Sequence, residues 1–497
     1  MSKNIQKYLY TNMNKEAGIE HAYHRTKIVA TVGPACNTYE KLLELVQAGV
    51  NIFRLNFSHG THEDKLEVIQ HIRKINATQP YNIAILGDLQ GPKLRVGEIE
   101  NGGLEIKTGD ILTFTSKEKV VGTKEKIYVS YPNLHNDVEV GNKILIDDGK
   151  IEVVVDAITA NGDVKVKVTY GGILLPKKGV NLPDTKISLP AMTEKDIADF
   201  EFIVANELDW IALSFVRKAE DIIDLKRRVN EKKSKIKVMA KIEMPSALVD
   251  LRNIVIESDG IMVARGDLGV ELPVEKVPMA QRDIIRKCIH RAKPVIVATQ
   301  MMESMMDRVK PNRSEITDVA NAVLEGADAV MLSGETATGN HPKLVVETMR
   351  KIITEVENTE YRYNREEDLK PQPHSPSFLS DAVCYNACKI AEDVNAQALI
   401  GMTQSGYTAF MLSSYRPKAP LYIFTKERSL VNQLSLSWGV RAFYYGEEES
   451  LDDIIFDQIN ILKERGFIKS NDVVVNTGST PIDQHLPTNV LKVTKID

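Results

Sequence analysis

Short and almost uninterrupted apolar segments recur along the chain, separated by helix-length stretches such as Tyr39–Ala48 and Ile316–Leu324. The first pattern is typical of strands buried on both faces, and the second is typical of amphipathic helices. Eight segments carry the strand pattern: Thr26–Thr31, Asn51–Phe57, Asn82–Leu86, Trp210–Phe215, Lys237–Ile242, Gly260–Ala264, Pro294–Ala298 and Ala329–Leu332. Strands that alternate with helices predict parallel βα units, and eight such units predict a closed (β/α)8 TIM barrel.

The alternation of strand and helix patterns is interrupted between the third and fourth segments, where residues 92–186 show a different pattern. Apolar and polar residues alternate there in five runs, namely Ile111–Thr115, Lys126–Ser130, Lys143–Ile146, Ile151–Ile158 and Asp163–Tyr170. Alternation with turn sequences such as Asp148-Gly149 predicts an inserted antiparallel β-barrel domain. Because loops after barrel strands surround the active site, a domain inserted at this point can cover the site as a lid.

The chain becomes charged and proline-rich at Glu366–Pro376, which we interpret as a linker. Helix and strand patterns then alternate again at Asp381–Val394, Ala398–Gly401, Thr408–Tyr415, Leu421–Phe424 and Val473–Thr477, which predicts an open α/β domain. The expected organisation is an N-terminal extension (1–23), a catalytic barrel (24–91 and 187–358), an inserted lid (92–186) and a C-terminal regulatory α/β domain (359–497).

Composition narrows the class of protein. The 497 residues are 43% hydrophobic and 26% charged, which are globular values. The net charge of -5 argues against nucleic acid as a partner, because binding to phosphate backbones needs an excess of Lys and Arg. Four cysteines without CxxC spacing suit a reducing compartment, and no apolar run approaches the roughly 18 residues that cross a bilayer. With no secretory signal at its start, the chain is expected to be cytoplasmic, with no membrane partner.

Ionisable and hydroxyl side chains follow six of the eight predicted strands, at the ends where barrel enzymes carry their chemistry. These strand ends contain Arg54-Leu-Asn56-Phe-Ser58-His59, Asp88-Leu89-Gln-Gly-Pro-Lys93-Leu-Arg95, Lys241-Ile-Glu243, Arg265-Gly266-Asp267, Thr299-Gln300 and Ser333-Gly-Glu335-Thr336. Six such ends in register predict one charged pocket. The usual phosphate motifs, GxxxxGK[ST], HRD and GxGxxG, are absent from the sequence, so any phosphate must be held by cations on the barrel.

Two carboxylates on neighbouring strands, Glu243 and Asp267, can share one hard cation such as Mg²⁺ while leaving positions for water and substrate oxygens. The alternative is that each carboxylate caps a helix or pairs with Arg265. Lys241 lies two residues before Glu243, so both side chains point to the same face of the strand. A lysine in this place serves as a Schiff-base nucleophile, as a fixed positive charge, or only as a partner in an ion pair at the barrel rim.

Further polar residues suit anions and hard cations. The planar guanidinium of Arg54 matches phosphate or carboxylate groups. Asn56, Ser58 and Asp88 offer only oxygen ligands and amides, which favours a hard cation over a transition metal. His59, Arg95 and Lys178 are each more often solvated surface residues, but together they form a candidate clamp for the phosphates of a nucleotide.

These motifs, with Lys177-Lys-Gly-Val-Asn-Leu-Pro183, Asp259-Gly-Ile-Met-Val-Ala-Arg-Gly-Asp-Leu-Gly269 and Met331-Leu-Ser-Gly-Glu-Thr336, resemble the pyruvate kinase family over residues 24–497. The resemblance implies transfer of a phosphoryl group from phosphoenolpyruvate to ADP with Mg²⁺ or Mn²⁺, the final step of glycolysis. It implies that Glu243 and Asp267 bind the metal, that Lys241 stabilises the transferring phosphoryl group, and that Arg54 binds phosphate. Substrate contacts are implied for Gly266, Asp267 and Thr299, and nucleotide contacts for Asn56, His59, Arg95 and Lys178.

Two catalytic details follow from this resemblance. Thr299 is expected to belong to the path that protonates the enolate, through a water relay that reaches Ser333 or Glu335. Many family members have Thr-Lys-Gly-Pro-Glu after the aspartate of strand three and need K⁺, whereas this chain has Leu89-Gln-Gly-Pro-Lys93. We therefore expect Lys93 to supply the charge of K⁺ and the enzyme to need little or no K⁺. The ligand set Asn56, Ser58, Asp88 and the Leu89 carbonyl is retained, so binding of K⁺ without dependence stays open.

The C-terminal domain resembles the effector-binding domain of the family. The hydroxyl-rich loop with Thr403, Ser405 and Thr408 resembles its phosphate loop, although Tyr407 replaces a more usual basic residue. The last loop, 478–485, lacks the arginine of a fructose-bisphosphate site, so a sugar phosphate or AMP remains open as effector. Homotetramers are usual in the family. The alternatives are a Schiff-base aldolase or another phosphoenolpyruvate-using barrel, and a degenerate barrel retained as a sensor or scaffold, which should have lost residues such as Lys241.

Overall fold

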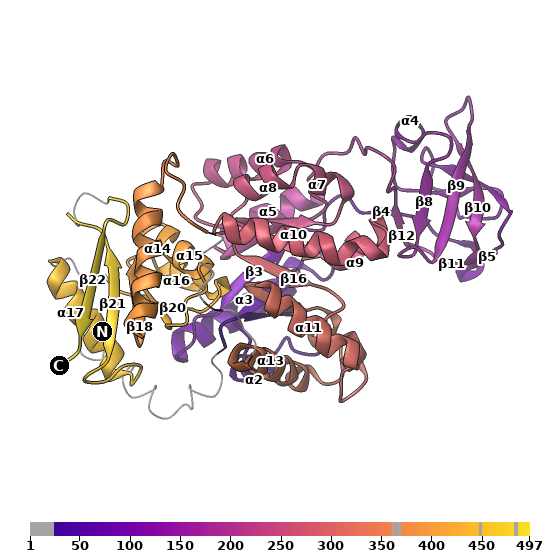
Figure 1. Ribbon diagram of the computed structural model, residues 1–497. Helices are drawn as coiled ribbons and strands as arrows, with labels where there is room; N and C mark the ends of the chain where they lie inside the picture. Colours follow the sequence, from indigo (N-terminus) through magenta and orange to yellow (C-terminus); the bar gives the residue numbers. More distant parts are fainter. Residues whose placement is uncertain (1–23, 360–362, 364–368, 447–449, 482–485) are drawn as a thin grey trace.

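The computed structural model describes residues 24–359, 363, 369–446, 450–481 and 486–497, and shows three bodies in a row (Figure 1). The barrel lies in the middle, the inserted β domain at one end and the C-terminal domain at the other. The predicted extension (1–23), part of the predicted linker and part of the last loop lie outside the described residues. None of the described helices is long and apolar enough to cross a membrane.

The eight predicted strand segments all form strands of one closed barrel, with ends shifted by at most two residues. In barrel order they are β1 (Lys27–Thr31), β17 (Ala329–Leu332), β16 (Val295–Ala298), β15 (Gly260–Ala264), β14 (Lys237–Ile242), β13 (Trp210–Leu213), β3 (Ala84–Asp88) and β2 (Ile52–Asn56). Every neighbouring pair is parallel. The prediction of a (β/α)8 barrel is therefore confirmed.

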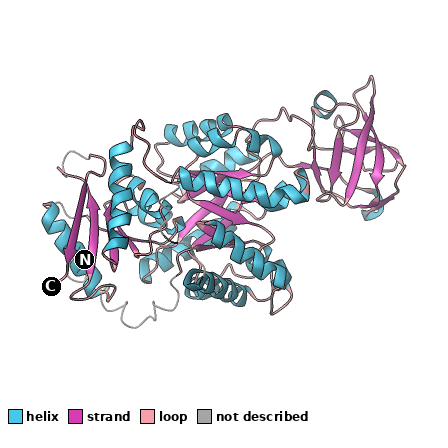
Figure 2. Cartoon of the chain, in the orientation of Figure 1, coloured by secondary structure: helices cyan, strands magenta, loops and turns pink. Residues whose placement is uncertain are grey.

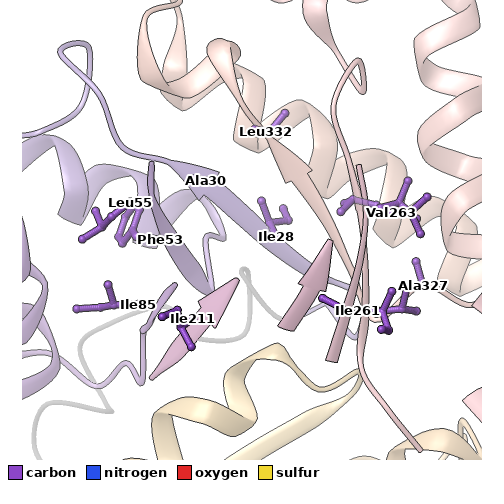
Figure 3. Packing of buried hydrophobic residues seen from close by; sticks show 14 of the residues in the cluster. Ile28, Ala30, Phe53, Leu55, Ile85, Ile211, Ile261, Val263, Ala327 and Leu332 are labelled. Carbon is purple, nitrogen blue, oxygen red and sulfur yellow. The ribbon is translucent and has the colours of Figure 1, made fainter. Parts of the chain in front are cut away.

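The uninterrupted apolar runs reflect burial on both faces of the sheet. Ile28 and Ile211 belong to the layer between strands and helices, whereas their neighbours Val29 and Trp210 fill the interior of the barrel. Figure 3 shows the outer layer, where isoleucine, leucine, valine and phenylalanine side chains extend from successive strands. Because side chains alternate between the faces of a strand, a strand in this environment needs an apolar residue at nearly every position.

Helices surround the strands (Figure 2). The longer ones are α2 (Tyr39–Ala48), α3 (His62–Thr78), α5 (Glu194–Ala205), α6 (Ala219–Glu231), α10 (Val277–His290), α11 (Arg313–Glu325) and α13 (Pro342–Thr359). Capping residues in the sequence fix where some of these helices begin. The Thr61 side chain caps α3 in a capping box with Asp64, and the Thr193 side chain caps α5 in a capping box with Asp196. A shorter helix, α9 (Arg265–Glu271), begins directly after β15 and carries Asp267 in its first turn.

The inserted domain contains a two-stranded sheet of β5 (Leu104–Ile106) and β11 (Gly172–Leu174), and a seven-stranded sheet whose edges meet. Its order is β4 (Leu94–Arg95), β12 (Gly179–Asn181), β8 (Lys143–Ile146), β9 (Ile151–Ile158), β10 (Val164–Tyr170), β6 (Ile111–Thr115) and β7 (Ile127–Tyr128). A bridge between Val96 and Val129 joins the two edges, so the sheet curls around its own apolar core. One pair, β6 with β7, is parallel within the otherwise antiparallel order. Residues 116–126 provide the return connection that a parallel neighbour requires.

The C-terminal domain is an open five-stranded sheet in the order β20 (Val440–Tyr444), β19 (Leu421–Thr425), β18 (Ala398–Met402), β21 (Val473–Gly478) and β22 (Val490–Lys495). The first three pairs are parallel, and β22 runs antiparallel at the edge. Its helices include α14 (Phe378–Asp393), α15 (Tyr407–Ser414), α16 (Arg428–Gln433) and α17 (Leu451–Glu464). The sequence pattern found the central strands and missed β20 and β22, whose mixed burial weakens the apolar signal.

A buried ion pair joins this domain to the end of the barrel opposite the strand-end pocket. Arg416, 1% exposed, lies with Nη2 3.1 Å from Oδ2 of Asp328, the residue before β17. Its guanidinium also donates to the carbonyls of Ser413 and Gly326. The Asp328 carboxylate accepts hydrogen bonds from the amides of Val295 and Trp438. The pair therefore connects the first residues of the barrel strands with the loop after α15.

Candidate active site

Lys241 lies in a buried cluster of charges at the carboxyl ends of the barrel strands. Its Nζ lies 3.0 Å from Glu243 Oε1 and 3.2 Å from Asp88 Oδ1, and it donates to Ser214 Oγ at 2.7 Å. Burial alone lowers the pKa of Lys241, but the carboxylates of Asp88 and Glu243 raise it by more, so the net pKa is above the ordinary value. Lys241 is therefore an ammonium ion held between two carboxylates, as a fixed charge requires.

Asp88 connects this ammonium to a second cation. Arg54 donates from Nε to Asp88 Oδ2 at 2.6 Å and from Nη1 to Thr31 Oγ1 at 3.1 Å. Burial opposes ionisation of Asp88, but Lys241 and Arg54 outweigh it and lower the pKa of this carboxyl group. Two cations thus flank one carboxylate that is only 1% exposed, and the side chain of Arg54 remains 12% exposed toward the mouth of the barrel.

Glu243 and Asp267 form the candidate metal pair. Glu243 Oε2 accepts a hydrogen bond from the Phe215 amide at 2.7 Å. Burial raises the pKa of Glu243 against the attraction of Lys241, and the charge of Asp267 raises it further. Asp267 also lies with Oδ1 3.2 Å from the ammonium of Lys93.

These two carboxylates fit a divalent ion that takes most of its ligands from water and substrate. Among the described residues no group of three or more His, Cys, Asp and Glu side chains is arranged to hold a metal, so a site made entirely of protein ligands is not found in this part of the chain. The alternative that the carboxylates pair with Arg265 is not observed. Arg265 instead pairs with Asp318 at 2.7 Å and donates to the Thr299 carbonyl at 2.7 Å.

Thr299 occupies a strained position at the end of β16. Its φ of 70° and the φ of 56° at Gln300 lie in the left-handed region, which a β-branched residue rarely adopts. The Gly266 amide donates to Thr299 Oγ1 at 2.7 Å, and the hydroxyl donates to the Ala298 carbonyl at 2.6 Å. Such strain persists only where surrounding contacts enforce it, and it is concentrated at functional sites.

The two predicted relay partners of Thr299 differ in their surroundings. Glu335 is 2% exposed and accepts hydrogen bonds from the amides of Met302 and Ser333, one on each carboxyl oxygen. Burial raises the pKa of Glu335. The Ser333 hydroxyl is buried and has no hydrogen-bond partner within the part of the chain that the structure describes. Ser333 is thus the partner with an unused hydroxyl, and Glu335 mainly holds two loops together.

The predicted nucleotide contacts are divided between two bodies. Asn56 and His59 lie in the barrel, where Asn56 Oδ1 accepts a hydrogen bond from the Ser58 amide. Arg95 and Lys178 lie in the inserted domain, where Arg95 donates to the Lys177 carbonyl and Lys178 pairs with Asp147 at 2.8 Å. No hydrogen bond or ion pair of the described residues joins the two groups. They can meet a common ligand only from opposite sides of the space between the bodies.

Three of the four predicted monovalent-cation ligands, Asp88, the Leu89 carbonyl and Asn56, already have protein partners. Asp88 binds Arg54 and Lys241, the Leu89 carbonyl accepts from Ser214 Oγ at 2.7 Å, and Asn56 bonds the Ser58 amide. The Lys93 ammonium contacts Asp267 rather than these oxygens.

Sequence reasoning missed Thr31, Ser214 and Phe215. Thr31 ends β1 and holds Arg54, and Ser214 follows β13 and holds Lys241. The strand-end rule used for the other six strands would have found both. Phe215 acts through its backbone amide, in a residue with φ of 54°, and no side-chain pattern signals that role.

The predicted effector loop lies before α15. Thr403 Oγ1 accepts from the Gly406 amide at 3.0 Å, Ser405 Oγ from the Tyr407 amide at 3.4 Å, and the Thr408 and Thr488 hydroxyls are 2.6 Å apart. The Tyr407 hydroxyl donates to the carboxylate of Asp381 on α14. The loop is therefore preorganised by its own hydroxyls, with a carboxylate close by.

The fold and the pocket define a class, namely a (β/α)8 barrel enzyme that handles anionic substrates at its strand ends. The sequence matches the families described as "Pyruvate kinase, barrel domain" at residues 23–346 and "Pyruvate kinase, alpha/beta domain" at residues 381–494. The chain belongs to the pyruvate kinase family. It is accordingly a glycolytic transferase that forms pyruvate and ATP from phosphoenolpyruvate and ADP, and enzymes of this family generally need a divalent metal.

Individual pyruvate kinases are similar to this protein over most of its chain. A pyruvate kinase of Geobacillus stearothermophilus is 41% identical over 472 residues, which are 94% of this chain and 80% of the relative. A pyruvate kinase of Clostridium acetobutylicum is 40% identical over 474 residues, 95% of this chain and 100% of the relative. The crystal structure of a pyruvate kinase from Cryptosporidium parvum has a TM-score of 0.90 at 35% identity, and covers 95% of this chain and 96% of that chain.

Proposed function

We propose that this enzyme performs its reaction with Mg²⁺ or Mn²⁺ bound by Glu243 and Asp267, and with Lys241 and Arg54 as the cations that bind the migrating phosphoryl group. The observation that carries this proposal is the position of Lys241, whose ammonium lies 3.0 Å from Glu243 and 3.2 Å from Asp88 in a buried pocket. When bound, the divalent ion would supply positive charge at the phosphoryl oxygens. Gly266, Asp267 and Thr299 surround the place for the carboxylate and enolate of the substrate.

The need for these cations follows from the charges of the substrates. Each pair of unit negative charges about 4 Å apart costs roughly 4 kcal/mol at an effective dielectric constant of 20. Phosphoenolpyruvate and ADP bring several such charges together, and transfer requires that the phosphorus and the attacking oxygen approach in line. Lys241 and Arg54 lie at the strand ends of the barrel, where their positive charges can offset those of the phosphates.

We further propose that Thr299 positions the water that protonates the enolate, with Ser333 as the next group of the relay. An unperturbed alcohol is too weak an acid to act alone, so Thr299 serves as a hydrogen-bonding group in the path. The unused hydroxyl of Ser333 supports this choice over Glu335, whose carboxyl oxygens both hold backbone amides.

A coupled assay of pyruvate formation tests the metal assignment. With phosphoenolpyruvate and ADP present, a chelator should abolish activity, and either Mg²⁺ or Mn²⁺ should restore it. Glu243→Gln removes the charge but keeps the shape, and should lower activity by about 10²-fold or more at fixed metal. Undiminished activity in the chelator would exclude a metal, and trapping of pyruvate on Lys241 by borohydride would indicate an aldolase instead.

We propose that the enzyme needs little or no K⁺, because the Lys93 ammonium, 3.2 Å from Asp267, adds a positive charge beside the candidate metal pair, although not among the predicted K⁺ ligands themselves. In the same assay, in a background of Tris or tetramethylammonium, added K⁺ should change the rate little. Lys93→Glu should give an enzyme that K⁺ activates strongly, which provides the matched comparison. A wild-type enzyme that is nearly inactive until K⁺ is added would contradict the proposal.

Two further proposals concern the assembly and compartment of the enzyme and its regulation. We propose a cytoplasmic homotetramer: the four cysteines are free thiols, which suits a reducing compartment, and β22 leaves an open edge with Val493 43% exposed that a second copy can cover. We propose the loop with Thr403, Ser405 and Thr408 as the site of a phosphorylated effector. Asp381 beside this loop should weaken binding of phosphate compared with a loop that carries a basic residue.

A further inference from the structure

One buried hydrogen bond joins the inserted domain to the helix that carries the candidate metal ligand. Asn181, the last residue of β12, donates from Nδ2 to Glu271 Oε1 at 2.8 Å. The two residues are each only 6% exposed. β12 is the strand by which the chain leaves the inserted domain, and Glu271 is the last residue of α9. The bond therefore connects the return segment of the lid directly to the barrel.

The surroundings of Glu271 oppose its ionisation. Burial and the negative charges of Asp267 and Asp184 raise the pKa of Glu271, the hydrogen bond from Asn181 lowers it, and the net pKa is about 7. Its Oε2 is buried and has no hydrogen-bond partner among the described side chains and backbone groups. A small cavity next to it is lined by both connections of the inserted domain, with Pro92 and Lys93 on one and Asn181 and Leu182 on the other. This is the place about which the inserted domain must turn if it moves.

Helix α9 meets the inserted domain and its connections at several points. Lys93 pairs with Asp267 at 3.2 Å, Asn181 binds Glu271, and a side chain placed on Gly149 would lie 4.0 Å from Val270. Asp267 and Glu271 are four residues apart, so they lie on the same face of the helix. The inserted domain and its connections are therefore anchored along this face of α9.

We infer that Asn181 and Glu271 form a latch that sets the angle of the inserted domain over the active site. Glu271 is a positioning residue in this latch: it touches no substrate, and it fixes the strand that follows Lys178. The consequence for the reaction rests on the proposed function, because the latch acts on catalysis by directing Arg95 and Lys178 toward the phosphates of the nucleotide. Binding of ADP should depend on the latch, whereas binding of phosphoenolpyruvate to the barrel residues should not.

Five variants test the latch. Glu271→Gln keeps an oxygen that accepts the hydrogen bond from Asn181, so it should behave as wild type. Glu271→Leu and Asn181→Ala remove the bond and should raise the KM for ADP about three- to tenfold, with little change in kcat or in the KM for phosphoenolpyruvate. Asn181→Asp places two carboxyl groups together and should raise the KM for ADP at least as much as Asn181→Ala does. Combining Asn181→Asp with Glu271→Gln restores one donor and one acceptor, and should recover most of the loss.

The position of the inserted domain is measured independently of activity. The four natural cysteines are buried, so dyes can be attached at Lys119→Cys on the inserted domain and Arg252→Cys on the barrel, both exposed. Glu271→Leu should broaden the distribution of dye distances, whereas Glu275→Leu, a change at an exposed residue soon after α9, should not.

The outcomes separate the latch from the proposed function. A broader distribution of dye distances together with a higher KM for ADP would support both the latch and the nucleotide role of Arg95 and Lys178. Broader distances with an unchanged KM for ADP support the latch and overturn the nucleotide role of Arg95 and Lys178. Unchanged distances in Glu271→Leu overturn the latch, as does a Glu271→Gln enzyme that loses as much as Glu271→Leu.

Discussion

Replacing Lys241 with methionine is expected to lower kcat by about 10³-fold, because removal of one preorganised charge from a phosphoryl-transfer site typically costs 10²- to 10⁵-fold. Methionine keeps the length and apolar stem of lysine and removes only the ammonium. The ammonium now lies between Asp88 and Glu243, and no other cation contacts Glu243 among the described residues. The measurement is steady-state pyruvate formation at saturating metal and substrates.

The loss of kcat should not be caused by unfolding. Lys119→Met at an exposed position is the control and should leave kcat unchanged. Lys241→Met should also lower the free energy of unfolding, because Glu243 is left buried without its cation, although Asp88 keeps its bond to Arg54 and Glu243 keeps the Phe215 amide. The kcat is therefore compared at a temperature at which circular dichroism shows the variant to be folded. A Lys241→Met enzyme within tenfold of wild type would show that the ammonium is only part of an ion pair at the rim.

Replacing Arg416 with alanine is expected to reduce the free energy of unfolding by about 3–5 kcal/mol, the usual cost of removing one partner from a buried ion pair. Asp328 would be left buried and charged, with two backbone amides but without its cation. The carbonyls of Ser413 and Gly326 would also lose their donor. Denaturant unfolding should show the C-terminal domain separating from the barrel or unfolding earlier than in wild type.

A double variant tests whether the unpaired charge of Asp328 causes the loss of stability in Arg416→Ala. Arg416→Met with Asp328→Asn removes both charges and should recover a large part of the lost stability, because apolar or neutral replacements of a buried pair are often tolerated. Activity at low temperature should remain near wild type, since the pair lies at the end of the barrel opposite Lys241. If Arg416→Ala unfolds like wild type, the pair contributes nothing measurable, and the interface is held by its apolar contacts alone.

The position of this ion pair bears on regulation. The C-terminal domain contacts the barrel where the strands begin, whereas the candidate catalytic residues lie where the strands end (Figure 1). An effector bound before α15 therefore cannot touch the reacting groups. Its influence would have to pass along the barrel or between subunits.

The sequence by itself determined the barrel and the place of its chemistry. Strands buried on both faces need apolar residues throughout, so the eight segments were visible, and the charged residues at their ends followed directly. The spacing of Lys241 and Glu243 also required no structure, because residues two apart on a strand share a face. The central strands of the curled inserted sheet were visible in their alternation, whereas the short strands β4 and β12 and the parallel pairing of β6 and β7 were not.

Only the tertiary structure decided which charges meet. Asp88 joins Arg54 and Lys241, Lys93 pairs with Asp267, and Asn181 binds Glu271 across 90 residues of sequence. These contacts depend on closure of the barrel and on the angle of the inserted domain, which no local pattern encodes. The Phe215 amide that holds Glu243 is a backbone group that every residue but proline carries, so its role becomes visible only when the strands are side by side.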